Sequence, residues 1–538
     1  MKTLLSALFV LIISQAFTQP LASKPKLVVG IVVDQMKAEY LYRFGDLYGA
    51  DGFNLLKEKG FVYKNAHFNY MPTKTGPGHA SIYTGTTPSR HGIIGNDWYN
   101  KYLNDDVYCA GDQNATAIGG SGKGGNISAK NIQVTTITDE LRMFTNNQSK
   151  VIGLSLKDRG AALPAGHNPT GAYWFDNTSC EFISSSYYTN QLPKWVDDFN
   201  KKDFPAQYME QSWTLSLPVE KYTASSPDNN PYERSLFGND APTFPYDLSK
   251  VEDKHQFRYS PYGNSIITEL ALAAIVGEKL GVDEYTDFLA ISYSTTDHVG
   301  HDFGPRSIEV QDTYLKLDKE FARLIKYLDA NFGRDEYVVF LTADHAVADV
   351  PAFLEDLQYP GGRFDKSGAD KIMASMKAKY GEGEWILNVS NDQIYLNHDL
   401  INQKGLSLYD FQDFLSLELI KLPYIAEALP AYILAHRSAN DPIVVRAQNG
   451  YNSELSGDVI IINKSGMLSE YRANKGTNHH SPYTYDTHVP IIFFGGNIPM
   501  GKSVREVSVT DIAPSISMLL DISLPSASTG KPLIELFE

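Results

Sequence analysis

The segment KLVVGIVVD, residues 26–34, decides the fold class of this chain. Its nearly continuous apolar run is typical of a strand that a parallel sheet buries on both faces. The run ends on Asp34, so an acidic residue stands at the carboxyl end of the strand. Open α/β sheets bind their ligands at this end of their strands, which makes Asp34 a candidate site residue.

The remainder of the chain repeats this strand-and-helix alternation. Similar apolar strands are predicted at 151–156, 288–294, 337–343 and 489–496, with helical patterns near 50–59, 132–146, 265–280 and 308–331. Another helix should begin near Gly76-Pro77, because proline is favoured in a first helical turn. The alternation predicts an α/β fold with a doubly wound, mainly parallel sheet and helices on both faces.

Two stretches interrupt the alternation and predict inserts. Residues about 186–260 are rich in proline, tyrosine and asparagine and indicate a loop-rich cap, whereas residues about 352–475 carry strand and helix patterns of their own. The second stretch predicts a small α+β insert between His345 and His479. The length alone favours about three to four domains, but one large α/β domain over 20–538 with both inserts fits equally well.

Residues 1–19 have the pattern of a secretory signal peptide. Lys2 supplies the positive start, LLSALFVLII the apolar core, and residues 14–18 a small-residue cleavage region. The apolar core is shorter than the roughly 20 residues that span a bilayer. No other stretch is long and apolar enough, so we expect a periplasmic or secreted protein without a membrane span, and a monomer.

The composition narrows the range of partners. A formal net charge of −16 argues against nucleic-acid binding, which normally needs a basic face. An acidic protein that handles anions must concentrate positive charge locally, and bound metals would do this.

The two cysteines leave a question open. Cys109 and Cys180 are the only cysteines, and export would permit a disulfide between them. Sequence alone does not establish that their Cα atoms come close enough to bond.

Potential metal ligands follow three strands and precede another. Asp34 follows the first; Asp297 and His301 follow the strand at 288–294, Asp344 and His345 follow 337–343, and His479 or its neighbour His480 precedes 489–496. Asp297 and His301 are four positions apart, so on a helix they share a face. Carboxylates in such apolar contexts are costly unless paired or metal-bound. A mixed oxygen and nitrogen ligand set suits zinc, with manganese or iron as substitutes.

A threonine and a basic pair complete a candidate phosphoryl-transfer site. Thr75, in TKTGPGH, stands at the expected start of a helix, where it is either a nucleophile favoured by the helix dipole or an ordinary capping residue. Lys157 and Arg159 follow the strand at 151–156, where they either bind an anionic phosphoryl group or form a surface cluster. Asn96 is a neutral donor candidate. Two metals about 4 Å apart would clamp an in-line displacement.

Seven segments in this order resemble the alkaline phosphatase superfamily, most closely its bacterial periplasmic PafA-type members. They are VVDQMKAEYL, MPTKTGPGHASIYTG, HGIIGNDWYN, SLKDRGAALPAGH, STTDHVGHDFGP, TADHAV and GTNHHSPYTYDTHVPIIFFGG. The resemblance implies two Zn²⁺ ions per chain. One would be held by Asp297, His301 and His479, and the other by Asp34, Thr75, Asp344 and His345. This chain has His479-His480-Ser481 where the family usually has His-Gly-Ser.

The resemblance also implies an activity. Thr75 would attack phosphorus and form a phosphothreonine, while Asn96, Lys157 and Arg159 would bind the phosphoryl oxygens, a pattern associated with monoesters. The expected enzyme is an exported alkaline phosphatase that hydrolyses phosphate monoesters and releases inorganic phosphate. The alternative is a phosphodiesterase/nucleotide pyrophosphatase or a phosphonate hydrolase of the same superfamily.

Overall fold

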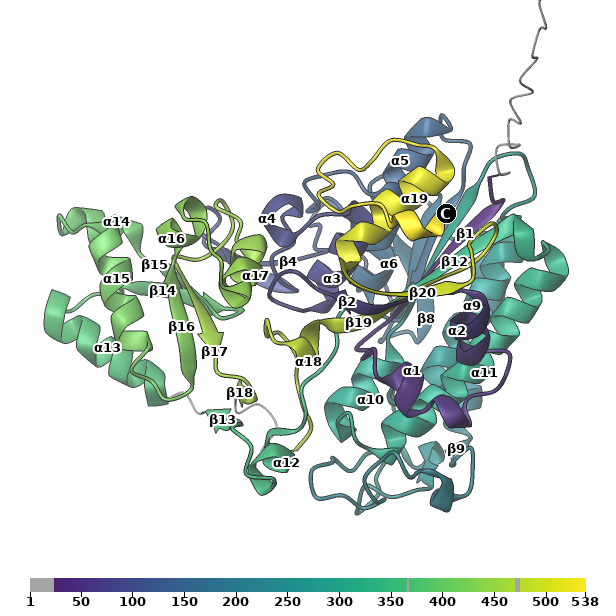
Figure 1. Ribbon diagram of the computed structural model, residues 1–538, viewed down its shortest axis with the longest axis horizontal. Helices are drawn as coiled ribbons and strands as arrows, with labels where there is room; N and C mark the ends of the chain where they lie inside the picture. Colours follow the sequence, from purple (N-terminus) through teal and green to yellow (C-terminus); the bar gives the residue numbers. More distant parts are fainter. Residues whose placement is uncertain (1–23, 365–366, 470–474) are drawn as a thin grey trace, which may run out of the picture.

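A ten-stranded sheet forms the centre of the molecule (Figure 1). The computed structural model describes residues 24–364, 367–469 and 475–538, so the predicted signal peptide at 1–19 lies outside the described residues. The strand order is β20 (Gly501–Ser508), β2 (Phe61–His67), β19 (His488–Gly495), β12 (Tyr337–Thr342), β1 (Leu27–Val33), β11 (Asp287–Tyr293), β6 (Val151–Ser155), β7 (Gly171–Asp176), β8 (Glu181–Ser185) and β5 (Ala117–Ile118).

The strands from β12 to β7 are parallel, and antiparallel pairs flank them on both sides. In the register of the central strands, Val32 of β1 pairs with Ser292 of β11 and with Thr342 of β12. The residues that follow these strands therefore emerge at one edge of the sheet. Every residue of β1 is buried, as its continuous apolar run predicts.

Helices cover both faces of the sheet (Figure 1). On one side lie α2 (Phe53–Lys59), α9 (Tyr262–Gly277) and α11 (Ile308–Asn331); on the other lie α3 (Thr75–Thr84), α5 (Ile137–Phe144), α6 (Asp158–Ala165) and α19 (Ile512–Leu520). The predicted α/β class is confirmed. Helix α5 is shorter than predicted: Thr136 caps its N-terminus in a capping box with Asp139, so the helix begins only at Ile137.

The chain between β12 and β19 builds a separate four-stranded sheet, hereafter the insert sheet. Its order is β14 (Ile386–Ser390), β15 (Gln393–Leu396), β17 (Val459–Asn463) and β16 (Ile425–Pro430). Helices α13 (Ser367–Tyr380) and α15 (Leu408–Leu419) pack on it around buried Trp385 and Phe411. In Figure 1 it projects to one side of the main sheet. Residues 186–260 contain short helices, including α7 (Lys194–Asn200) and α8 (Phe204–Met209), and long loops.

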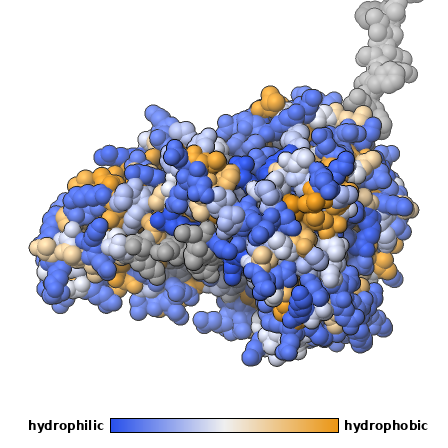
Figure 2. Space-filling view, turned by 90° about the horizontal axis from the view of Figure 1, so that it is seen from below, coloured by the Kyte–Doolittle hydropathy of each residue, from blue (hydrophilic) through white to orange (hydrophobic). Residues whose placement is uncertain are grey.

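One face of the molecule is mostly polar (Figure 2), and the two cysteines are unpaired. The face in Figure 2 is mostly hydrophilic, with small, scattered hydrophobic spots. Within the described ranges, no helix is both long and apolar enough to cross a membrane. Cys109 is buried and Cys180 is half-buried, and both thiols are free.

Two glutamates are buried between residues 186–260 and helix α11. Glu309, in the first turn of α11, accepts a hydrogen bond of 2.7 Å from the hydroxyl of Tyr246. Its Oε2 atom and that of Glu233 are buried without a hydrogen-bond partner among the described residues. Burial raises the pKa of Glu309 to about 8 and that of Glu233 to about 10, and the charge of Glu309 adds to the effect on Glu233.

Glu309 should make the protein less stable as the pH rises. Its folded pKa lies above the unfolded value of about 4.3, so unfolding releases a proton between about pH 4.3 and pH 8, and stability falls across that window. Glu309→Gln retains an acceptor for Tyr246 but cannot ionise. Its gain in melting temperature over wild type should therefore be larger near pH 8 than near pH 5. The same substitution at exposed Glu284 is the control; an equal shift at both pH values for Glu309→Gln would contradict the prediction.

Candidate active site

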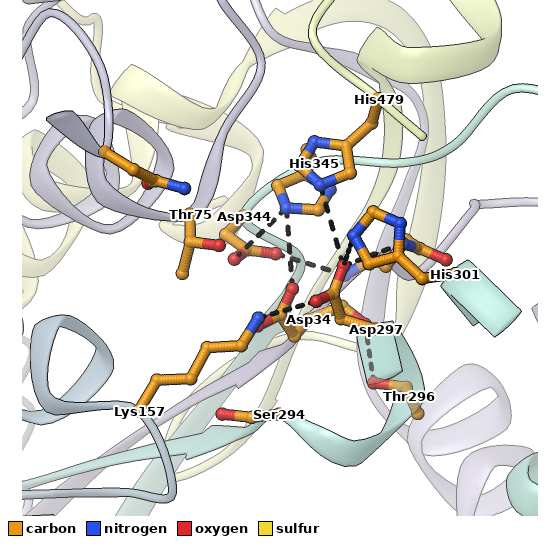
Figure 3. A network of polar contacts seen from close by, with 12 residues as sticks. Asp34, Thr75, Lys157, Ser294, Thr296, Asp297, His301, Asp344, His345 and His479 are labelled. Atoms are coloured by element: carbon orange, nitrogen blue, oxygen red, sulfur yellow. Dashed lines mark hydrogen bonds and ion pairs between the residues drawn. The ribbon is translucent and has the colours of Figure 1, made fainter. Parts of the chain in front are cut away.

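Three aspartates meet at the carboxyl edge of the sheet (Figure 3). Asp34 directly follows β1, Asp344 lies two residues beyond β12, and Asp297 stands in the first turn of α10 (Thr295–Phe303), which follows β11. Because β12, β1 and β11 are neighbours, residues far apart in sequence come together here. All three side chains are buried, so their charges need compensation from nearby groups.

Three histidines direct their Nε2 atoms towards this cluster. Nδ1 lies close to a backbone carbonyl in each: 2.8 Å from Thr477 for His301, 3.0 Å from Ala346 for His345, and 2.7 Å from Thr73 for His479. A carbonyl oxygen can only accept, so Nδ1 carries the proton and Nε2 keeps its lone pair. Proteins orient metal-binding histidines in this way.

The Nε2 atoms face carboxylate oxygens across short gaps. His345 Nε2 lies 3.5 Å from Asp34 Oδ1 and 3.6 Å from Asp344 Oδ2. All three atoms are buried and have no hydrogen-bond partner in the described part of the chain. Around Asp297 Oδ1, His301 Nε2 lies at 3.0 Å and His479 Nε2 at 3.6 Å. An imidazole lone pair that faces carboxylate oxygens is repelled unless a proton or a metal cation lies between them, so the donor atoms around His345 fit a bound metal.

Two groups of donor atoms are compact enough to hold a metal ion. Asp34, Asp344 and His345 form one and Asp297, His345 and His479 the other, with the atoms of each group within 4.8 Å of one another. His345 belongs to both, whereas the family resemblance assigns it to the first and adds His301 to the second. The 3.0 Å contact of His301 with Asp297 keeps it within reach of the second group. Nitrogen and carboxylate ligands in this mixture suit zinc and its first-row neighbours.

Two of the three carboxylates, those of Asp34 and Asp344, resist ionisation without a cation. Burial, followed by the charges of Asp297 and Asp344, raises the pKa of Asp34 to about 8. Burial also raises the pKa of Asp344 to about 6. A divalent cation would favour the charged forms of both groups.

Lys157 connects the two halves of the cluster. Its Nζ lies 2.6 Å from Asp34 Oδ2 and 2.7 Å from Asp297 Oδ2, on the oxygens that do not face the histidines (Figure 3). Burial alone would lower the pKa of Lys157, but the charges of Asp297 and Asp34 raise it above its ordinary value. The ammonium is therefore a fixed positive charge at the centre of the site.

Thr75 begins helix α3 and lies beside Asp344 (Figure 3). Its side chain is buried, and as the first residue of a ten-residue helix it lies at the positive end of the helix dipole. The helix approaches closely because residue 78 is glycine. A Cβ there would lie 2.2 Å from the backbone oxygen of Asp344. The structure thus brings the predicted nucleophile to the metal-binding side chains.

Asn96 contacts the residue after Thr75, and Arg159 is held by Tyr108. The Oδ1 atom of Asn96 accepts a hydrogen bond of 2.8 Å from the backbone N–H of Gly76, which leaves its amide NH₂ group as a donor. Arg159 Nη1 donates to the hydroxyl of Tyr108 at 3.1 Å, and its Nε is buried without a partner among the residues described. The hydroxyl of Tyr108 in turn donates to Asp158, so the group that holds the guanidinium is itself fixed.

The structure separates the two adjacent histidines and adds a residue that the sequence did not single out. His480 turns away from the cluster, with Nε2 3.3 Å from Asp392 of the insert sheet. Gln35 was missed: its Nε2 donates to Asp297 Oδ1 at 2.7 Å and its backbone N–H donates to Asp344 Oδ1 at 3.2 Å. Its φ of 65° is the structural feature that permits both contacts, and sequence pattern does not reveal it.

The chain is similar in sequence and in fold to known proteins. Residues 28–488 match the family model of type I phosphodiesterase / nucleotide pyrophosphatase. The alkaline phosphatase PafA of Elizabethkingia meningoseptica is 45% identical over 95% of this chain and 94% of its own length. This chain belongs to the PafA-type alkaline phosphatase family. The predicted resemblance is confirmed, and the chain is a hydrolase of the phosphatase class.

Two further comparisons agree with this membership. The alkaline phosphatase PhoV of Synechococcus elongatus is 42% identical over 97% of this chain and 94% of its own length. The crystal structure of wild-type PafA has a TM-score of 0.92 and 45% identity, and the match covers 96% of this chain and 99% of that one. PafA-type membership and the buried donor cluster together support a metal cofactor.

The adjacent histidines should differ in their effect on metal binding. His479→Ala removes a nitrogen that faces Asp297, and we expect metal affinity to fall by about 100-fold or more. His480→Ala is the matched control and should retain the wild-type metal content. Metal analysis after equilibrium dialysis measures both. Equal metal content in the two variants, or loss in His480→Ala alone, would contradict this assignment.

Proposed function

We propose that this protein is an exported, metal-dependent alkaline phosphatase that hydrolyses phosphate monoesters to release inorganic phosphate. The observation that carries the proposal is the position of Thr75, a buried hydroxyl at a helix N-terminus beside the metal-binding cluster. A hydroxyl so placed can act as a nucleophile once a base or a metal lowers its pKa. The family relatives, which are named alkaline phosphatases, support the same reaction.

We assign two Zn²⁺ ions to the cluster. Asp297, His301 and His479 would hold one, and Asp34, Asp344, His345 and Thr75 the other. The inward-facing Nε2 atoms and the partnerless oxygens of Asp34 and Asp344 support this division. When bound, such metals supply a lowered pKa for the attacking oxygen and stabilisation of charge on the leaving oxygen.

The chain's own side chains would attack the phosphorus atom and bind the phosphoryl oxygens. The Thr75 hydroxyl would attack phosphorus and displace the alcohol, and water would then hydrolyse the phosphothreonine. The NH₂ group of Asn96 would donate to a phosphoryl oxygen, since its carbonyl is already occupied by Gly76. An ammonium has three N–H donors, so Lys157 retains one for phosphate after serving Asp34 and Asp297.

Charge favours a monoester over a diester as substrate. A monoester carries two negative charges at alkaline pH and a diester only one, while Lys157 and Arg159 bring two fixed positive charges to the site. Arg159 has an unpartnered Nε in the described structure and can offer its planar fork to two phosphoryl oxygens. Of the alternative reactions, cleavage of a phosphodiester or a nucleotide pyrophosphate would make less use of this pair, because the phosphorus attacked carries only one negative charge.

Three accompanying features remain predictions. Export depends on residues 1–19, which lie outside the described residues. A periplasmic or secreted location and a monomeric state follow from the sequence, and small phosphate monoesters are the proposed partners. Nucleic acid is an unfavourable partner because of the net charge of −16.

Removing the nucleophile should stop turnover and preserve the metal site. Thr75→Ala should lower kcat for an aryl phosphate by on the order of 10³-fold or more and abolish the phosphoenzyme. Thr75→Ser is the matched control because it keeps a hydroxyl. Acid-quench trapping of labelled phosphoenzyme, with metal analysis alongside, measures both effects. Wild-type turnover in Thr75→Ala would refute the proposed mechanism.

Substrate preference tests Arg159. Arg159→Ala should lower kcat/KM for an aryl phosphate by about 10²- to 10³-fold and that for its methyl diester much less, because the diester has one fewer anionic oxygen. Arg505→Ala, which changes a remote arginine paired with Glu535, is the control. Steady-state kinetics on both substrates decide the question. Equal losses, or a wild-type preference for the diester, would favour the phosphodiesterase alternative.

A further inference from the structure

A tight turn of the insert sheet reaches the active site. Strands β14 and β15 form a hairpin in which Ser390 pairs with Gln393, so the turn consists of Asn391 and Asp392 alone. Their φ angles are 53° and 58°. Two-residue hairpin turns with positive φ at both positions favour asparagine and aspartate, which tolerate the left-handed conformation. The side chains of both turn residues also contact segments outside the hairpin.

The side chain of Asn391 joins two segments of the site. Its Oδ1 accepts a hydrogen bond of 2.6 Å from Nζ of Lys74, the residue before Thr75. Its Nδ2 donates to the backbone carbonyl of Asp97, the residue after Asn96. The amide also packs on Gly95, where a Cβ would lie 2.5 Å from Nδ2. No methyl group fits between the hairpin and this loop.

These contacts close a ring of bonds around the proposed catalytic residues. The backbone N–H of Gly76 donates to Asn96 Oδ1 at 2.8 Å, which joins the nucleophile segment to the Asn96 segment on one side. Asn391 joins the same two segments on the other side, through Lys74 and Asp97. Thr75 and Asn96 thus lie in a closed ring, and removal of the Asn391 side chain opens it.

Asp392 anchors the turn. Its backbone oxygen accepts from the N–H of Ile461 at 2.7 Å, and its Oδ1 accepts from Asn463 at 3.3 Å, both in β17. Its Oδ2 lies 3.3 Å from His480, the neighbour of His479. The insert sheet therefore holds the hairpin tip rigidly against segments that flank three site residues.

We propose that Asn391 is a positioning residue for the phosphatase reaction: it sets the distance between the Thr75 hydroxyl and the phosphoryl-binding NH₂ group of Asn96. The inference rests on the proposed roles of Thr75 and Asn96. Reacting groups lose about 10²-fold in rate when misplaced by about 1 Å, so a residue that holds two such groups in register has a large effect without touching substrate.

The test is the kinetics of Asn391→Gly. Glycine adopts positive φ freely, so the turn should persist while both side-chain bonds are lost. We expect kcat/KM for an aryl phosphate to fall about 10- to 100-fold with unchanged metal content. Asn391→Asp, which still accepts from Lys74 but cannot donate to Asp97, should lie between glycine and wild type. The matched control is Asn146→Gly, at an exposed asparagine that also has a positive φ, 50°, and lies far from Asn391 in the sequence.

A double-substitution cycle separates positioning from a purely structural role. If Asn391 acts through Asn96, adding Asn391→Gly to Asn96→Ala should cost much less than it costs wild type. Wild-type kcat/KM in Asn391→Gly, an equal loss in both backgrounds, or a loss that follows metal content would overturn the inference. Thr75→Ala distinguishes failure of the proposed function from failure of this inference. Wild-type activity in Thr75→Ala would refute the proposed function itself. An inactive Thr75→Ala together with wild-type activity in Asn391→Gly would refute only the role of Asn391.

Discussion

The charge of three buried aspartates is the constraint on which the site depends. Asp344, Asp34 and Asp297 follow the adjacent strands β12, β1 and β11, and the apolar sheet beneath them cannot solvate their carboxylates. The structure compensates from two directions. Lys157 binds one oxygen each of Asp34 and Asp297, and Asp34 Oδ1 faces Nε2 of His345 at 3.5 Å. This balance of charge fits a bound metal cation.

Backbone groups determine the orientation of the histidines and the approach of helix α3 to the cluster. Carbonyls of Thr73, Ala346 and Thr477 determine which histidine nitrogen keeps its lone pair. The close approach of helix α3 to Asp344 requires a glycine at position 78, and this approach brings Thr75 to the candidate metal ligands. The insert sheet adds a third layer of support through Asn391. The candidate metal ligands and the proposed nucleophile and phosphoryl-binding groups are thus held by different parts of the chain.

Much of this could be predicted from sequence because the central strands are buried on both faces. Continuous apolar runs identified β1, β6, β11, β12 and β19, and the polar residues that follow the first four runs and precede the last marked the edge of the site. Strands β2, β7, β8 and β20 were not predicted. The polar residues of β2, Lys64, Asn65 and His67, and the exposed side chains of β20 break the apolar run on which the prediction depends. Gln35 escaped notice because its role depends on a positive φ, and Asn391 because its partners are about 300 residues away.

The sequence by itself determined the fold class, the strand-end ligands and the family, since these depend on local hydrophobicity and on ordered motifs. Only the tertiary structure decided that His479 faces Asp297 while His480 faces Asp392, because neighbouring residues differ in direction rather than in type. It likewise revealed that Lys157 spans two carboxylates and that Asn391 closes the ring around Thr75 and Asn96. Such contacts join residues distant along the chain, and their distances exist only after the chain has folded.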